Sequence, residues 1–213
     1  MGKRALLITD VTNCFCPPNG ELAVPGGHEV VYPINKVFRY AEDHPEEYAI
    51  IVLTRDWHDK GSLHFKKWPE HGMKFTLGSE FYPGLRIRSF KIPVAIISKG
   101  LRYLDGYSPY DPAWAVNIIL VMPNGNVYLW EGDLDSLLKH HDVDTIINTG
   151  LALNYCVKAG CLAAREKGYQ VYLPLDACRS INVPSDPDNS PGNAFKEMEK
   201  TGVIFTTTAK LLA

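Results

Sequence analysis

The chain alternates between short runs of consecutive apolar residues and longer segments in which apolar residues recur at helical spacing. The short runs are rich in β-branched residues and predict strands at 5–9, 49–54, 94–98, 145–149, 170–176 and 203–206. The longer segments predict helices over 30–42, 134–141 and 157–167. Unbroken apolar strands are typical of parallel sheets that are buried on both faces. The alternation therefore predicts an α/β fold, a three-layer, doubly wound, mostly parallel sheet with helices on both faces.

Other segments lack this periodicity. Residues 13–27 are rich in proline and glycine, and residues 182–193 are rich in polar turn formers, so both are predicted to be loops. Residues 59–92 predict a long functional loop with short helical pieces. Two apolar runs within 117–130 flank Asn124-Gly125, which predicts a β-hairpin. No repeat or linker divides the chain, so we expect one domain over residues 1–213.

Composition narrows the classes of function. The chain is 46% hydrophobic and 22% charged with a net charge of −2, which gives no electrostatic case for a nucleic-acid or membrane partner. No apolar run approaches the roughly 20 residues of a membrane helix, and the N-terminus leads directly into the first strand without room for a signal peptide. The five cysteines are odd in number and scattered, which predicts a reducing, cytoplasmic location rather than a disulfide framework.

Reactive side chains follow four of the predicted strands. Asp10, Asp56 and Lys99 stand at strand ends, and Cys156 lies where the strand 145–149 passes into a helix. In open α/β sheets ligands bind at those ends, and a helix N-terminus favours a thiolate. Taken singly, Asp10 could be a helix cap, Lys99 a solvated lysine and Cys156 a buried thiol. Together, Asp10 as base, Lys99 as a positive partner and Cys156 as nucleophile predict acyl transfer through a thioester.

A second set of polar residues lies in and after the second strand. Asp56, His58 and His71 offer one carboxylate and two imidazoles, and His64 is near enough in sequence to be a fourth ligand. Such a set suits Zn²⁺, Fe²⁺ or Mn²⁺ with positions open for water and substrate. The alternative is that these residues are ordinary polar loop residues. On spacing alone the two hypotheses are evenly matched.

These motifs resemble the nicotinamidases of the isochorismatase-like cysteine hydrolase family, over residues 5 to about 179. The matching stretches are Leu7–Val11 with Phe15–Pro17, Ala23–Gly27, Thr54–His58, Trp68–His71, Gly78–Phe81, Ser98–Gly100, Thr149–Ala152 with Tyr155–Val157, and Gly168–Tyr169 with Asp176–Arg179. The aspartate, lysine and cysteine set marks the amidase members, and the Asp-x-His…His metal set marks nicotinamidases among them.

The resemblance implies conversion of nicotinamide to nicotinate and ammonia. It makes Asp10 the general base, Lys99 its electrostatic partner and Cys156 the nucleophile. It also implies a cis peptide between Leu151 and Ala152, with the N–H groups of Ala152 and Cys156 forming an oxyanion hole.

The resemblance further implies one divalent metal ion, zinc before iron or manganese, held by Asp56, His58 and His71 and ligated by the pyridine nitrogen of the substrate. His64 falls where some members have a histidine ligand. Phe15 and Trp68 would enclose the aromatic ring, with Leu151 also at the substrate. Members are often dimers or larger, so a homo-oligomer is left open.

The sequence departs from the family pattern in three places. Thr12 and Cys14 replace an amide and an acid, and Gly72 stands where a cysteine is common. Residues 109–131, with the predicted hairpin, form an insertion between the lysine and the cysteine. These departures leave the preferred amide open.

Three other hypotheses follow from those departures. One is a related cysteine amidase that acts on another small amide, such as a ureido or carbamoyl compound, although such relatives generally lack the metal set. Another is a non-catalytic small-molecule-binding protein of the same fold. A third makes Cys14 and Cys16 a redox or metal pair, for which Cys-x-Cys alone is weak support.

Overall fold

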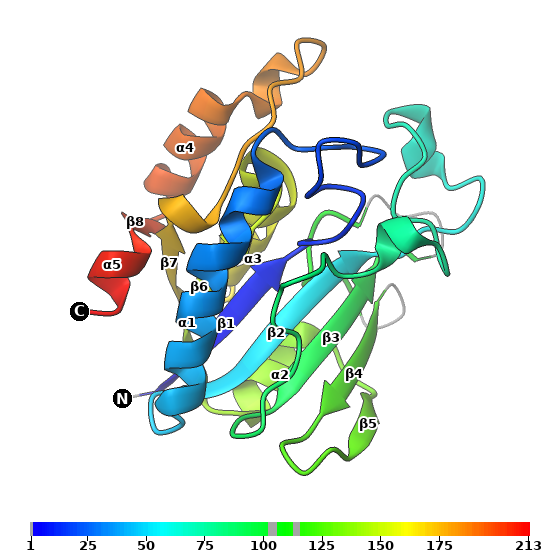
Figure 1. Cartoon of the computed structure of the whole chain (residues 1–213). Coiled ribbons are helices and arrows are strands. Elements are labelled where there is room, and N and C mark those ends of the chain that lie inside the picture. The colour runs from blue at the N-terminus through cyan, green and yellow to red at the C-terminus, as the bar shows by residue number, and fades with distance from the viewer. Residues whose placement is uncertain (1, 102–105, 113–115) are drawn as a thin grey trace.

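The computed structural model describes residues 2–101, 106–112 and 116–213. Its centre is an eight-stranded sheet in the order β5-β4-β3-β2-β1-β6-β7-β8 (Figure 1). The strands are β1 Lys3–Thr9, β2 Tyr48–Asp56, β3 Val94–Lys99, β4 Asn117–Val121, β5 Val127–Trp130, β6 Val143–Gly150, β7 Gln170–Pro174 and β8 Ile204–Thr206. The neighbours from β3 through β2, β1, β6 and β7 to β8 pair in parallel, and the pairs β3–β4 and β4–β5 are antiparallel.

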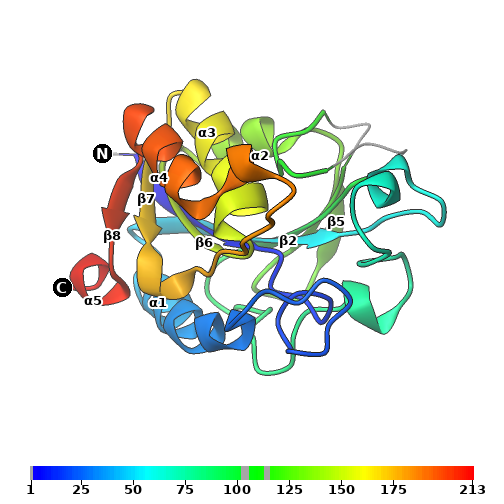
Figure 2. The same ribbon diagram turned by 90° about the horizontal axis from the view of Figure 1, so that it is seen from above.

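Helices cover both faces of the sheet (Figure 2). One face carries α1 Val31–Asp43 and α5 Thr208–Leu211, and the other carries α2 Leu134–His140, α3 Lys158–Glu166 and α4 Pro191–Lys200. Each face has its own apolar cluster against the sheet. In α1, for example, Ile34, Val37, Phe38 and Ala41 form one fully buried stripe. The predicted doubly wound α/β sheet is confirmed.

The predicted strands and helices agree with the structure to within a few residues, but the prediction omits two helices, α4 and the short α5. Residues 182–193 are not loop throughout, because α4 begins at Pro191. The side chain of Ser190 caps this helix by accepting from the Asn193 N–H, and Ala194 and Met198 form its buried face. Ser-Pro followed by apolar residues four apart is a helix start that the polar composition of the segment obscures.

The predicted hairpin is also confirmed. Strands β4 and β5 pair antiparallel, and the turn between them is closed by the Met122 N–H, which donates to the Asn126 carbonyl at 2.8 Å. Gly125 supplies a positive φ of 88° in this turn. Within the predicted insertion 109–131, residues 113–115 lie outside the described residues.

The order of the strands places a crevice at the centre of the sheet. From β1 the chain builds outward through β2 and β3 on one side, and it later returns to add β6 against the other side of β1. Loops leaving β1 and β6 therefore diverge to opposite faces, and ligands bind at such a switch point. Asp10 and Cys156 follow these two strands.

No helix among the described residues combines the length and apolar character needed to cross a membrane.

Gly150, the last residue of β6, has no room for a side chain where β6 meets β1 at the crevice of the sheet. Its φ is +112°, and a Cβ there would lie 2.0 Å from the carbonyl oxygen of Thr9. Gly168 has a similar φ of +92°, but a Cβ there meets nothing within 4 Å among the described residues.

We expect Gly168→Ala to cost about 1–2 kcal/mol from backbone conformation alone. Gly150→Ala should cost roughly 1–3 kcal/mol more, because it also forces β1 and β6 apart. Urea unfolding of both variants measures the difference. Equal losses would show that the close approach to Thr9 is unimportant.

Candidate active site

Four neighbouring strands bring their polar end residues together. Lys99 ends β3, Asp56 ends β2, Asp10 follows β1, and Cys156 lies beyond β6. The side chain of Lys99 is completely buried among the other three. Its Nζ lies 2.8 Å from Oδ2 of Asp10, contacts Oδ1 of Asp56, and lies 3.6 Å from Sγ of Cys156. The structure thus places all four residues that the sequence puts at strand ends in one buried cluster.

Asp10 is held by both its backbone and its side chain. It adopts a left-handed φ of 52°, and Oδ1 accepts a 2.6 Å hydrogen bond from the Thr54 hydroxyl. Burial raises the pKa of the Asp10 carboxyl above its ordinary value, and the nearby charge of Asp56 adds to this, while Lys99 and Thr54 oppose it. A carboxylate with a raised pKa is a stronger base than an ordinary aspartate.

Cys156 lies in a π-helical turn, Leu153–Val157, that precedes α3. Burial raises the pKa of its thiol well above the ordinary value, although the charge of Lys99 acts in the opposite direction. Removal from water outweighs the opposing charge of Lys99, so deprotonation needs a base. The expectation of a thiolate at this helix N-terminus is therefore wrong for the resting thiol. An ionised Asp10 can accept the thiol proton, because one of its carboxylate oxygens lies within 4.8 Å of Sγ of Cys156 and the carboxylate shares a hydrogen bond with the thiol.

The two charged partners on β2 and β3 stabilise each other. Burial alone would lower the pKa of Lys99, but the charges of Asp10 and Asp56 outweigh it and raise that pKa well above its usual range. Burial would likewise raise the pKa of Asp56, but the charge of Lys99, together with His58 and His71 beside it, holds that pKa well below its usual range. Lys99 is therefore a permanent cation in the cluster.

The peptide between Leu151 and Ala152 is cis, as expected from the resemblance. Ala152 lines the cavity beside Cys156. Leu151 does not, because its side chain is fully buried in the apolar cluster on the α1 face. A contact between Leu151 and substrate stays a prediction.

Three histidines from the loop after β2 converge beside Asp56. One ring nitrogen each of His58, His64 and His71 lie within 4.8 Å of one another, and all three side chains are buried. Oδ2 of Asp56 lies 3.6 Å from Nε2 of His58 and 3.4 Å from Nε2 of His71. The structure thus brings His64 to the same place as the three other residues of the sequence-predicted metal set.

The outer hydrogen bonds of these histidines fit a metal centre. Nδ1 of His58 donates to the Gly100 carbonyl at 3.2 Å, and Nδ1 of His71 donates to the Pro69 carbonyl at 2.7 Å, because a carbonyl can only accept. Each ring then presents the lone pair of Nε2 toward Asp56. Nε2 of His58 is buried without a hydrogen-bond partner among the described residues. A buried imidazole lone pair without a partner, beside a carboxylate, suits a divalent cation.

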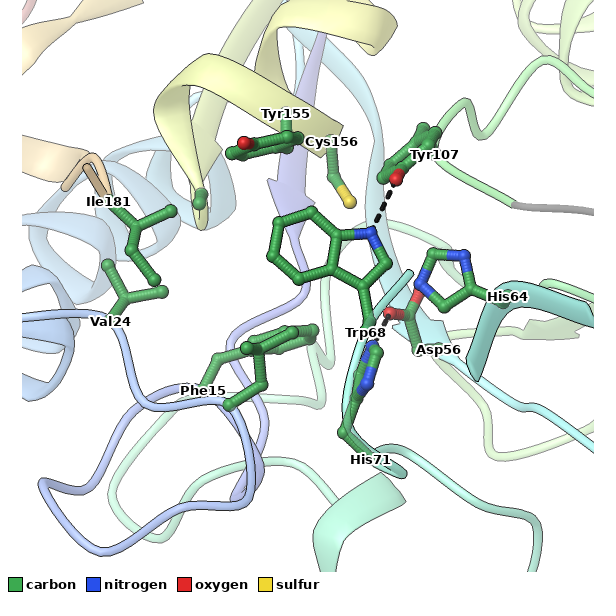
Figure 3. A pocket seen from close by; sticks show the side chains of 12 residues that line it. Phe15, Val24, Asp56, His64, Trp68, His71, Tyr107, Tyr155, Cys156 and Ile181 are labelled. Carbon is green, nitrogen blue, oxygen red and sulfur yellow. Dashed lines mark hydrogen bonds and ion pairs between the residues drawn. The ribbon is translucent and has the colours of Figure 1, made fainter. Parts of the chain in front are cut away.

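Cys156 and Asp56 from the catalytic cluster and two of the histidines, His64 and His71, line one cavity of about 370 Å³, the open space at its mouth included (Figure 3). Its residues are Phe15, Leu22, Val24, Asp56, His64, Trp68, His71, Tyr107, Ala152, Tyr155, Cys156 and Ile181. Phe15 and Trp68, which the resemblance implies would enclose the substrate ring, supply aromatic walls of this cavity. The Nε1–H of Trp68 donates to the Tyr107 hydroxyl at 2.6 Å, and its ring meets the edge of Tyr155 at a centroid distance of 5.1 Å.

Sequence reasoning misses several of these walls. Tyr107 and Ile181 lie in segments without periodicity, so nothing in the sequence directs attention to them. Tyr155 is visible only as the neighbour of Cys156. The departures at Thr12 and Cys14 prove to be locally satisfied, because the hydroxyl and thiol are 3.2 Å apart and buried together.

Cys14 and Cys16 do not form a reactive pair. Both are buried free thiols, and burial raises the pKa of Cys16 to about 12 and that of Cys14 well above its ordinary value. Thiolate chemistry there is disfavoured.

A buried thiol, carboxylate and lysine at the switch point of a doubly wound sheet define a cysteine hydrolase site. The Isochorismatase domain model matches residues 125–210. The nicotinamidase of Escherichia coli (strain K12) is 30% identical over 98% of this chain and 97% of that protein, and the nicotinamidase of Saccharomyces cerevisiae is 28% identical over 87% and 91%. The chain therefore belongs to the nicotinamidases of the isochorismatase-like hydrolase family.

Solved structures agree with this assignment. A nicotinamidase/pyrazinamidase of Acinetobacter baumanii superposes with a TM-score of 0.78 at 25% identity, covering 99% of both chains. The pyrazinamidase of Pyrococcus horikoshii, solved in complex with zinc, superposes with a TM-score of 0.71 at 30% identity, covering 96% of this chain and 99% of that one.

The bond between Thr54 and Asp10 yields a pH prediction. Asp10 must be ionised to accept the thiol proton, so activity is lost as the pH falls through the pKa of Asp10. The Thr54 bond lowers that pKa. Thr54→Val should therefore move the acid limb of the kcat/KM profile to higher pH. Thr149→Val is the matched control, since that buried hydroxyl donates to the Leu7 carbonyl at 3.1 Å. An acid limb that stays in place in Thr54→Val would show that another group titrates.

Proposed function

We propose that this enzyme hydrolyses nicotinamide to nicotinate and ammonia through a thioester on Cys156. The observation that carries the proposal is the cluster of Asp10, Lys99 and Cys156, buried at one side of an aromatic cavity with a histidine set at another. The similarity to nicotinamidases along nearly the whole chain supports the same reaction.

The cavity suits a flat aromatic amide. Phe15 and Trp68 offer apolar faces to a pyridine ring, and both are more than nine-tenths buried. Asp56, His58, His64 and His71 would hold a divalent cation, and we propose zinc, because imidazole and carboxylate ligands suit it and the Pyrococcus horikoshii relative was solved with zinc. When bound, that ion would supply a Lewis acid able to hold a pyridine nitrogen.

The first half-reaction forms the thioester. Asp10 accepts the proton of the Cys156 thiol, and the sulfur attacks the carboxamide carbon. The N–H groups of Ala152 and Cys156 stabilise the oxyanion. As the intermediate collapses, the C–N bond breaks, and Asp10 returns the proton to the leaving nitrogen, which departs as ammonia.

The second half-reaction regenerates the enzyme. Asp10, again ionised, accepts a proton from water, whose oxygen attacks the thioester carbon. The C–S bond breaks, nicotinate leaves, and the proton returns to Cys156. Throughout, Lys99 keeps the cluster from carrying two uncompensated carboxylates and stabilises the thiolate as it forms.

We also propose that the chain forms a single domain and that the protein is cytoplasmic. All five cysteines are free thiols, the state that a reducing compartment maintains.

Ammonia release from nicotinamide, with and without a chelator, tests the reaction and the metal together. We expect ammonia release that the chelator abolishes and added Zn²⁺ restores, because the histidines would hold the ion that in turn holds the pyridine nitrogen. Absence of release from zinc-loaded enzyme would reject nicotinamide and direct the search to ureido or carbamoyl amides.

Cys156→Ala tests the nucleophile. Turnover should fall by on the order of 10⁴-fold or more, since removal of a nucleophile leaves only binding and oxyanion stabilisation. Zinc content and nicotinate binding by calorimetry should be retained. The control is Cys161→Ala, which removes a different buried thiol, one that lies in α3, and should retain turnover. Substantial turnover by Cys156→Ala would exclude the thioester route.

A further inference from the structure

The carboxylate of Asp186 joins three segments at the edge of the cavity. Its Oδ2 lies 2.9 Å from Nζ of Lys67 and accepts a 3.1 Å hydrogen bond from the Tyr155 hydroxyl. Both of its oxygens accept from Nδ2 of Asn189 at 3.1 Å. These partners belong to the loop after β2, to the π-helical turn and to the segment 181–189 itself.

Two of these partners adjoin residues of the active site. Lys67 precedes Trp68, and its Nζ lies 5.5 Å from the centre of the Trp68 ring. Tyr155 precedes Cys156, and its ring contacts that of Trp68. A shift of Asp186 would therefore be transmitted, through Lys67 and Tyr155, to the Trp68 wall of the cavity.

The segment held by Asp186 also supplies a wall of its own. Ile181 lines the cavity, and its backbone is fixed by Asn154, whose Nδ2 donates to the Ile181 carbonyl at 2.9 Å and whose Oδ1 accepts from the Ile181 N–H at 3.1 Å. In Figure 3, Ile181 and Val24 lie on the side of the cavity away from Asp56, His64 and His71. A pyridine ring with its nitrogen toward the histidines would present its far edge to Ile181.

We propose that Asp186 is a positioning residue that fixes the width of the cavity at this far edge, and so excludes amides whose ring carries a substituent there. This inference rests on the proposed function. The hydrogen bond that Lys67 donates to Asp186 lowers the pKa of the Asp186 carboxyl, so this group is charged at neutral pH. Lys67 is 51% exposed, so its ion pair with the 14% exposed Asp186 contributes little to folding. Loss of the bonds of Asp186 should therefore change the shape of the cavity more than the stability of the fold.

The test compares nicotinamide with 5-methylnicotinamide, whose methyl group lies on the ring edge away from the nitrogen and the carboxamide. Wild type should strongly prefer nicotinamide. Asp186→Ala should raise the kcat/KM ratio of 5-methylnicotinamide to nicotinamide by roughly tenfold, the low end of what one misfitting methyl group costs in a packed pocket. For nicotinamide itself, KM should rise and kcat should stay within about twofold, because the reacting groups are untouched.

Three further variants separate shape from stability. Asp186→Asn keeps an acceptor for Tyr155 but loses the charge, so its ratio should lie between those of wild type and Asp186→Ala. Lys67→Met should behave like Asp186→Asn, and it decides the question if Asp186→Ala does not fold. Lys91→Met is the matched control, because it removes a surface ion pair with Asp43 at 2.6 Å outside the cavity, and its ratio should equal that of wild type.

The outcomes are distinct. A wild type that releases no ammonia from nicotinamide contradicts the proposed function, and the role of Asp186 falls with it. An active wild type whose substrate ratio is unchanged in Asp186→Ala and Lys67→Met rejects the role of Asp186 alone. The same rejection follows if Lys91→Met shifts the ratio as much as they do.

Discussion

The fully buried ammonium of Lys99 is the constraint on which the rest of this site depends. Moving such a charge out of water costs several kcal/mol unless opposite charges accompany it. Here two carboxylates do so, Asp10 from β1 and Asp56 from β2. Asp56 and Lys99 are direct register partners in the β2–β3 ladder, so the ion pair also specifies that register. A slip of one residue would point the lysine to the opposite face and leave the carboxylates uncompensated.

Asp56 connects two kinds of chemistry. One of its oxygens contacts Lys99, and the other faces His58 and His71. Together Asp10, Asp56 and Lys99 carry a net charge of about −1 when ionised, which a divalent cation at the histidines would offset. The hydrolytic cluster and the metal set are therefore electrostatically dependent on each other, and a substitution at Asp56 disturbs both.

The sequence is most informative where periodicity applies. Buried strands have unbroken apolar runs, so their ends, and with them Asp10, Asp56 and Lys99, can be located from the order of residues alone. The histidines stand out by their spacing. The protonation of the resting Cys156 thiol is not predictable in this way, because burial depends on what packs around a residue and not on its neighbours in sequence. Ile181, Tyr107 and Asp186 lie in aperiodic segments, where only tertiary contacts show what a residue does.

The position of β1 in the sheet has a consequence for synthesis on the ribosome. This strand lies between β2, which follows it closely in the chain, and β6, which spans Val143–Gly150. At about 5–20 residues per second, the second edge of β1, whose central residues 5–8 are all apolar, waits on the order of ten seconds for its partner. During that interval the nascent chain exposes an open β-edge that other chains can pair with. The order of synthesis thus closes the centre of the sheet only after the rim at β5 has been made.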